Sequence, residues 1–216
     1  MINMDLNFDF TEKRIIITSF FCVAFIIANL ITVKIIDVNF LGMQTPAGVL
    51  IYPLIYILTN VITNVYGEKA AQRTLILGIA TNVLFVFMTT LILVLPSPSF
   101  YTGDSSLAFV FTQTPRILIA SYFSYLMGNL TTAKLTTIVN KGNSLLRVKN
   151  LGAIFTGELV DNIIFIGLSF IGTVAIVDVV IMIFSHWIIS IVWNIIAQPF
   201  TEKVTSWAKK GKVEEI

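Results

Sequence analysis

Six apolar segments, each about twenty residues long, occupy most of this chain. A hydrocarbon core about 30 Å thick is crossed by roughly 20 apolar residues in helical conformation. The chain has 216 residues, of which 56% are hydrophobic and only 12% charged, whereas soluble domains are about 25% charged. The apolar segments span residues 15–33, 45–65, 74–95, 117–139, 151–173 and 176–197. We therefore predict an all-α membrane protein with six transmembrane helices, in a single integral membrane domain covering residues 1–216.

Basic residues lie mainly in alternate loops between these segments. Eleven of the 14 lysines and arginines lie before the first segment, in the second and fourth loops or after the last segment. Only two lie in the remaining loops, and Lys134 lies inside a segment. Lysine and arginine favour the cytoplasmic side of a membrane, so we predict that both termini are cytoplasmic. Since this topology accounts for the basic C-terminal tail, we expect contact with membrane lipids and no nucleic-acid partner.

The sequence contains no recognisable catalytic motif. It has one cysteine, Cys22, and one histidine, His186, which are too few for a zinc site built from those residue types. No nucleophile elbow, phosphate-binding glycine loop or zinc-protease motif is found. We therefore predict no enzymatic activity, no metal and no cofactor. An intramembrane enzyme, the alternative, would need a nucleophile or metal site that these motifs do not supply.

Two parts of the chain resemble each other. Residues 28–35 (ANLITVKI) and 128–135 (GNLTTAKL) share four of eight positions, and NVITN at 60–64 aligns with ELVDN at 158–162 at nearly the same offset. Helices one to three then correspond to helices four to six. Because three is an odd number, the second copy crosses the membrane in the opposite sense, which predicts the 3+3 inverted-topology repeat of many secondary transporters. Chance similarity between apolar helices is the alternative, since the third and sixth helices show no match.

The stretch GELVDN places two acidic residues inside an otherwise apolar segment. Positions i, i+3 and i+4 share one face of a helix, so Glu158, Asp161 and Asn162 project together, with Phe165 one turn further on. A charge near the centre of a bilayer costs at least roughly 2.5–3.5 kcal/mol. We therefore expect these side chains to face a cavity or a partner.

Other polar and aromatic residues are predicted to join them in a binding site. Carboxylates accept parallel hydrogen bonds from an N–H edge, amides both donate and accept, and aromatic rings stack. This chemistry suits a planar polar ligand, neutral or cationic, such as a purine-like base. The further residues predicted to bind this small-molecule substrate are Asn60, Asn64, Lys134, Tyr56, Trp193 and Asn194, and the candidates for binding a coupling proton are His186 and Asp161.

Several of these residues also have structural interpretations. Lys134 could neutralise Glu158 or Asp161 without touching a ligand. His186 could be a buried, hydrogen-bonded structural histidine, and Trp193 could anchor its helix at the membrane interface. The sequence does not decide between these interpretations. It is compatible with a homodimer but does not specify the oligomeric state.

Three blocks of the sequence resemble a known family. YPLIYILTNVITNVYGEKAAQR at 52–73, TPRILIAS at 114–121 and TGELVDNIIFIGLSFIG at 156–172 are similar, in this order, to conserved blocks of the queuosine precursor transporter family, also called the vitamin uptake transporter family. The resemblance implies a multi-pass protein of the bacterial inner (cytoplasmic) membrane. It would import a 7-deazaguanine base such as preQ0, preQ1 or queuine, which is salvaged into the queuosine of tRNA.

The resemblance also assigns residues. Glu158 and Asp161 match the acidic pair of the family, and Tyr66, Gly67 and Arg73 match the block at the end of the second helix. The family usually has T-D-x-x-N-E-x-Y-G in that helix, whereas this chain reads T-N-x-x-T-N-x-Y-G. Two acidic positions are thus occupied by asparagine, which leaves fewer carboxylates to attract a cationic base.

The first segment offers an alternative function. Ala24 and Ala28 in AFIIA have the four-residue spacing that lets helices pack closely. This spacing resembles the docking motif of the substrate-capture subunits of energy-coupling-factor vitamin transporters, which are also six-helix proteins. Such a subunit would require an energising partner.

Overall fold

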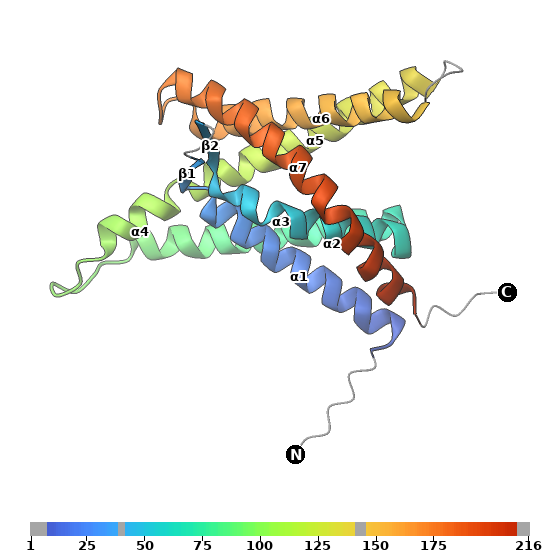
Figure 1. Ribbon diagram of the computed structural model, residues 1–216. Helices are drawn as coiled ribbons and strands as arrows, with labels where there is room; N and C mark the ends of the chain where they lie inside the picture. The colour runs from blue at the N-terminus through green and yellow to red at the C-terminus, as the bar shows by residue number, and fades with distance from the viewer. Residues whose placement is uncertain (1–7, 39–41, 141–145, 211–216) are drawn as a thin grey trace.

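A computed structural model describes residues 8–38, 42–140 and 146–210 of the chain. Helices dominate the fold, and one small hairpin of strands joins the first two long helices (Figure 1). In chain order the elements are α1 (Phe10–Ile31), β1 (Ile35–Val38), β2 (Met43–Pro46), the 3-10 helix η1 (Ala47–Leu50), α2 (Tyr52–Tyr66), α3 (Glu68–Val94), α4 (Asp104–Phe111), α5 (Thr114–Asn140), α6 (Leu146–Phe170) and α7 (Ile176–Lys209). Each of the six predicted segments thus contains a helix.

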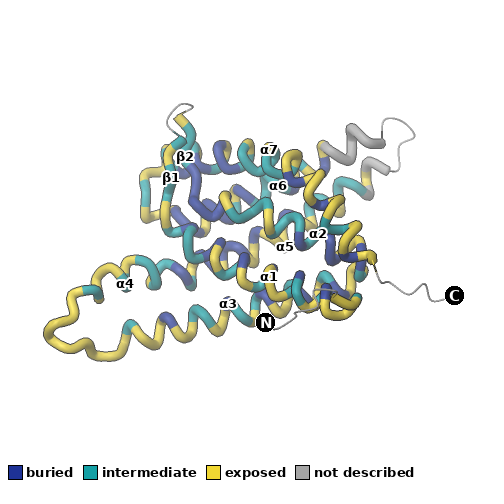
Figure 2. Tube along the Cα trace, turned by 60° about the horizontal axis from the view of Figure 1, so that its bottom comes forward, coloured by how far each residue is buried: buried dark blue, intermediate teal, exposed yellow. Residues whose placement is uncertain are grey.

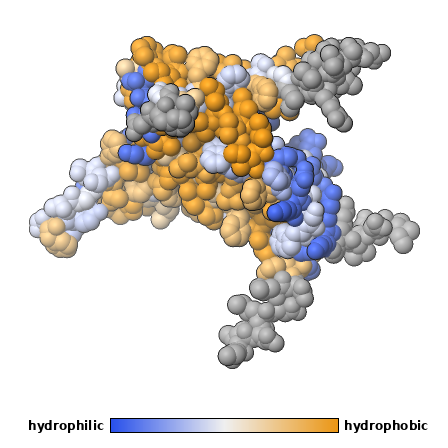
Figure 3. All heavy atoms as spheres, viewed as in Figure 1, coloured by the Kyte–Doolittle hydropathy of each residue, from blue (hydrophilic) through white to orange (hydrophobic). Residues whose placement is uncertain are grey.

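Four helices of the described chain are long and apolar enough to cross a membrane, namely α1, α3, α6 from Gly152 onward, and α7. Apolar residues form a broad band over the middle of the molecule (Figure 3). The chain is therefore a mostly helical, multi-pass membrane protein. The number of six spans and the orientation of the chain in the membrane remain predictions. Two of the basic residues from which the orientation is predicted, Lys141 and Lys212, lie outside the described residues.

The second helix begins later than the sequence predicts. Residues 45–65 were expected to be helical throughout, but Met43–Pro46 form a strand and α2 starts at Tyr52. Proline disfavours helical backbone in the residue before it, so Pro46 keeps Thr45 extended. The 15 residues of α2 extend over only about 22 Å at a rise of 1.5 Å per residue.

Local capping explains where other helices begin and end. The Asp9 side chain accepts a hydrogen bond from the Glu12 backbone N–H at 2.7 Å, and Glu12 accepts from the Asp9 N–H at 2.8 Å, which forms a capping box at the start of α1. Gly67 separates α2 from α3 with a φ of 85°, a left-handed conformation that glycine adopts without steric cost. Gly67 is thus the C-cap of α2 and the N-cap of α3.

The helices form two groups joined by α7. Figure 1 shows α5 and α6 side by side as a long hairpin, α1, α2 and α3 as a second group, and α7 crossing both. One buried cluster, which includes Ile17, Val61 and Ile62, joins α1 to α2. A second cluster, which includes Ile117, Phe165 and Met182, joins α5, α6 and α7. Figure 2 shows the buried residues concentrated where these groups meet, whereas α4 lies apart and contains no buried residue.

Glycine allows the closest approach between helices. A Cβ atom built on Gly157 would lie 1.8 Å from Thr132 Oγ1, and one built on Gly128 would lie 2.9 Å from Asp161 Cβ. Since α5 and α6 meet at these positions, only glycine fits at either without displacing the other helix. This contact fixes the rotation of the helix that carries Glu158 and Asp161. The same helix begins at Leu146, earlier than predicted, so Glu158 lies at its centre.

A polar contact joins the β-hairpin to α7. Strands β1 and β2 are antiparallel, with Ile35 opposite Pro46. Thr45 Oγ1 lies 2.8 Å from His186 Nδ1, and the backbone N–H of Gln44 donates to Ser185 Oγ at 3.3 Å. Thr45 and His186 are almost fully buried. The hairpin therefore closes the end of the bundle opposite the turn between α2 and α3 (Figure 1).

The glycine contact predicts a difference between two neighbouring glycines of α6. Gly157→Ala should lower the temperature of thermal unfolding in detergent, because overpacking typically costs about 1–3 kcal/mol. Gly152→Ala is the matched control: nothing lies within 4 Å of a Cβ at this exposed position, and alanine favours a helix over glycine by about 1 kcal/mol. Its unfolding temperature should stay the same or rise. Equal melting temperatures for the two variants would contradict the packing described above.

Candidate functional site

Two neighbouring cavities lie between the helix groups. The α7 cavity, of about 360 Å³, is bounded by α2, α5, α6 and α7. The α3 cavity, of about 550 Å³, is bounded by α1, α2, α3, α5 and α6. The residues that line both are Tyr52, Ile55, Thr59, Tyr125, Asn129 and Asp161. These six residues form the shared wall, and the two cavities are therefore compartments of one interior region.

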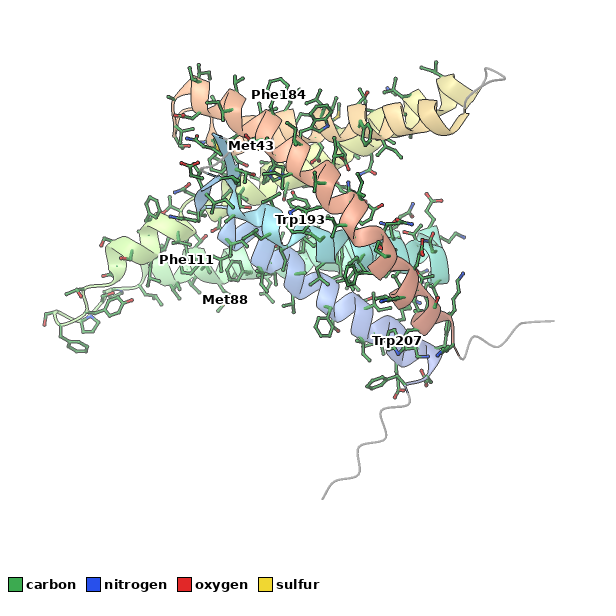
Figure 4. The ribbon with its side chains drawn as sticks, in the orientation of Figure 1. Met43, Met88, Phe111, Phe184, Trp193 and Trp207 are labelled. Carbon is green, nitrogen blue, oxygen red and sulfur yellow. The ribbon has the colours of Figure 1, made fainter. Side chains whose placement is uncertain are left out.

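Glu158 is the centre of the α7 cavity. Asn194 Nδ2 donates a hydrogen bond to Glu158 Oε1, whereas Glu158 Oε2 is buried without a partner among the described residues. Trp193, the neighbour of Asn194 on α7 (Figure 4), has a buried indole N–H that likewise lacks a described partner. A buried polar group without a hydrogen bond costs about 1–3 kcal/mol, more if it is charged. The cavity thus offers one acceptor and one donor that a ligand can satisfy.

Three asparagines of the cavity retain part of their hydrogen-bonding capacity. Asn162 donates to the backbone oxygen of Glu158 at 2.8 Å, Asn60 to that of Tyr56 at 2.8 Å, and Asn129 to that of Tyr125 at 2.7 Å. Each of these bonds uses one of the two N–H donors of the amide and none of its oxygen lone pairs. The bonds within each helix orient the amides in the cavity wall.

Asp161 occupies the shared wall and touches both cavities. Tyr52 on α2 and Tyr125 on α5 both lie close enough to interact with its charge. Gly128 on α5 faces its Cβ atom and leaves room for it. Glu158 and Asp161 share a helix face, as predicted, but they lie in different surroundings: Glu158 is hydrogen-bonded to Asn194 on α7, whereas Asp161 is hydrogen-bonded to Ser124 on α5 and has the two tyrosines nearby.

His186 lies at the end of the α7 cavity that the hairpin closes. Its ring contacts Tyr52 edge-on, with centroids 5.4 Å apart, and Phe165 at 6.2 Å. One ring nitrogen, Nδ1, is occupied by Thr45, and the side chain is only 1% exposed. This environment matches a buried, hydrogen-bonded histidine at a contact between two elements, although the residue also lines the cavity.

The structure brings together most of the residues predicted for the site. The α7 cavity is lined by Glu158, Asp161, Asn162, Asn60, Tyr56, Trp193 and Asn194, together with His186. Phe165 lines the α3 cavity instead. Two predicted residues are placed elsewhere: Asn64 and Lys134 are exposed and line neither cavity. Lys134 therefore does not neutralise the acidic pair in this structure.

Sequence reasoning missed part of the lining. Tyr125, Asn129 and Thr132 come from α5 and form one wall of the α7 cavity. Asn129 and Thr132 are two of the four positions at which residues 28–35 and 128–135 are identical. This identity suggested the repeat, but it did not indicate that the two residues line a site. Tyr52, which is not among the predicted site residues, also lies in the shared wall.

This arrangement can bind a planar ligand with a polar edge. A carboxylate oxygen accepts an N–H, an indole N–H donates to a carbonyl or ring nitrogen, and flanking rings stack on the ligand. Among the described residues no three His, Cys, Asp or Glu side chains are grouped closely enough to hold a metal ion. The volume and the mixed lining are those of a small-molecule site.

Comparison with known proteins identifies the family. A family model described as "putative vitamin uptake transporter" matches residues 46–204. A curated protein of Bacillus subtilis (strain 168), named "probable queuosine precursor transporter", is 24% identical over 181 residues, which is 82% of this chain and 78% of that protein. No solved structure matches the chain. The match covers most of the chain, including every helix that bounds the α7 cavity, and this chain therefore belongs to the vitamin uptake transporter family.

Proposed function

We propose that this chain imports a 7-deazaguanine precursor of queuosine (preQ0, preQ1 or queuine) across the bacterial inner membrane for salvage into tRNA. The observation that carries the proposal is the buried Glu158 Oε2, which has no hydrogen-bond partner within the described part of the chain and lies in a cavity that also offers aromatic faces. The kinship with a protein named as a probable queuosine precursor transporter supports the class of substrate. The three bases share one bicyclic ring and differ in the substituent on it.

Each part of the ring system has a candidate partner. The N–H edge of the pyrimidinone ring pairs with Glu158, which Asn194 holds in place. The ring carbonyl accepts from the indole N–H of Trp193 or from an asparagine amide of the cavity wall. Tyr56 supplies an aromatic face. A site whose buried polar groups match a ligand rejects analogues that leave them unpaired, because each unpaired group costs about 1–3 kcal/mol.

The packing of the helices supports an inverted repeat and gives its register. Thr32 lies against Gly48, where a Cβ would come within 2.2 Å of Thr32 Oγ1, just as Thr132 lies against Gly157. Thr32 and Thr132 are equivalent in the internal repeat. We infer that Gly48 and Gly157 are equivalent too, which pairs Tyr52 with Asp161. This register differs from the one that the sequence alignment predicts, in which Asn60 pairs with Glu158.

The lining of the cavities follows the same repeat. Phe25, Ala28, Asn29 and Thr32 of the first copy line the α3 cavity, and their equivalents Tyr125, Gly128, Asn129 and Thr132 line the α7 cavity. Two pseudo-equivalent half-sites on either side of a shared wall are what an inverted repeat is expected to build near the midplane. In a transporter of this type, access alternates between the two membrane faces as the repeats exchange conformations.

The structure corresponds to one of these two states. Glu68 and Gln72, exposed residues at the start of α3 on the predicted cytoplasmic side, line the mouth of the α3 cavity. On the opposite side the hairpin is bonded to α7. We therefore assign this conformation as inward-open. Entry of a base from outside requires the contact between the hairpin and α7 to separate.

The capture-subunit alternative has lost its supporting observation. Ala24 and Ala28 are 1% and 6% exposed, so their small side chains pack within this chain and do not present a docking surface for another protein. Uptake by the chain alone in proteoliposomes distinguishes the two functions, because a capture subunit would bind the base without transporting it.

Uptake in cells tests the proposed function. In bacteria that lack both their own importer and the synthesis of queuosine precursors, expression of this chain should restore queuosine in tRNA when a precursor is supplied. Glu158→Ala should reduce uptake roughly ten- to hundredfold, since a hydrogen bond to a charged group contributes about 1.5–3 kcal/mol. Lys134→Ala is the matched control, because Lys134 lies outside both cavities. Full uptake by the Glu158 variant would refute the site, and no uptake by the wild-type chain in the membrane would refute the substrate.

A reversible cross-link tests the assigned gate. In a Cys22→Ala background, which removes the single native cysteine, Gln44→Cys and Ser185→Cys replace two residues in direct contact. Oxidation should lock the hairpin to α7 and stop uptake into proteoliposomes, and a reducing agent should restore it. Each single variant under the same oxidation should transport normally. Undiminished uptake by fully cross-linked protein would show that this contact need not open.

A further inference from the structure

The two cavities are acidic and contain no basic side chain among the lining residues that the structure describes. Their carboxylates are Glu158, Asp161 and, at the mouth, Glu68. Apart from lysine and arginine, which are absent from the described lining, His186 is the one lining residue that can carry a positive charge. Its Nδ1 atom is hydrogen-bonded to Thr45. No described lysine or arginine lines either cavity, so a bound ligand or a bound proton is the candidate source of positive charge beside Glu158 and Asp161.

Asp161 differs from Glu158 in what surrounds it. Glu158 accepts a hydrogen bond from Asn194 and belongs to the α7 cavity alone. Asp161 lies in the wall between the two cavities, where Ser124 on α5 hydrogen-bonds its carboxyl group and Tyr52 and Tyr125 are further neighbours, and Phe165 lies one turn along the same helix. Aromatic faces attract ammonium groups most strongly when water is excluded. A carboxylate among such rings suits an alkylammonium better than it suits a neutral group.

The geometry also separates the two acidic positions along the ligand. A ring bound through Glu158 would lie in the α7 cavity, and Asp161, one turn along the same helix in the shared wall, would face a substituent that extends in that direction. Asp161 borders the α3 cavity as well, which leaves room beyond the wall for a longer substituent. Two carboxylates on one helix face can thus bind two ends of one ligand.

We infer that the site selects planar bases that carry a positively charged amine over neutral bases with the same ring, and that Asp161 binds the amine while Glu158 binds the ring. This inference rests on the proposed function, and it adds a specificity-determining residue and a ligand charge. The replacement of two family acids by Asn60 and Asn64 does not oppose it, because Asn64 lies outside both cavities and the required charge is supplied by Asp161.

Two probes separate charge from shape. PreQ0 carries a nitrile and is neutral, whereas preQ1 carries an aminomethyl group on the same ring and is cationic. Purified full-length chain in proteoliposomes should take up preQ1 at least tenfold faster than preQ0 at equal low concentration. Asp161→Asn, which keeps the size of the side chain and removes its charge, should slow preQ1 uptake at least tenfold more than it slows preQ0 uptake, so that the preference for preQ1 is lost.

Glu158→Gln serves as the matched variant. It should slow the uptake of both bases by a similar factor, because the ring is common to them. Equal uptake of preQ0 and preQ1 by the wild-type chain, or equal loss of both in Asp161→Asn, would overturn the inference while leaving the proposed function in place. Uptake of neither base by the wild-type chain would overturn both. The comparison between the two bases needs only the wild-type chain, so poor folding of a variant does not remove the test.

Discussion

The contact of Gly157 with Thr132 is the constraint on which the rest of this site depends. It brings α5 and α6 closer together than any residue with a Cβ would allow, and a helix held that closely cannot rotate. Glu158 follows Gly157 directly and Asp161 comes one turn later, so the same contact aims both carboxylates towards the cavities. In an apolar bundle these charges are costly to bury, and the glycine contact keeps them oriented towards the interior instead of the lipid.

The sequence predicts the helices and the acidic face better than it predicts the ends of the helices. Apolar periods and the i, i+3 spacing are local, so the helices around Ile17, Glu158 and Met182 follow from composition. The hairpin of Ile35–Val38 and Met43–Pro46 does not, because each strand has only four residues, too few for a period of apolar residues to distinguish a strand from the end of a helix. The long-range bond from Thr45 to His186, residues 141 positions apart, has no local signal at all.

The site itself was predictable to the same extent. Residues that share a helix with Glu158 were placed correctly in relation to it, since helix geometry fixes them. The direction in which side chains on the other helices face depends on how far each helix is rotated about its own axis, and the sequence does not specify this rotation. This is why Asn60 reaches the α7 cavity whereas Asn64, one turn later on α2, is exposed, and why Lys134 points away from the acids that it could have neutralised. The sequence similarity at residues 128–135 singled out Asn129 and Thr132, but only the packing of the helices shows that they line the α7 cavity.

In the proposed inverted repeat, Tyr52 pairs with Asp161, and a symmetric scaffold would thereby hold an asymmetric ligand. Both residues lie in the one wall that the two cavities share, so under this proposal the repeats would exchange roles while the wall stays central. A symmetric pair of acids at that wall would repel each other in a medium of low dielectric constant. With a tyrosine in one copy and an aspartate in the other, the wall keeps a single charge and adds an aromatic face beside it. Under this proposal, the helix packing would provide access from two sides, and the departure from the repeat at Asp161 would provide chemical selectivity.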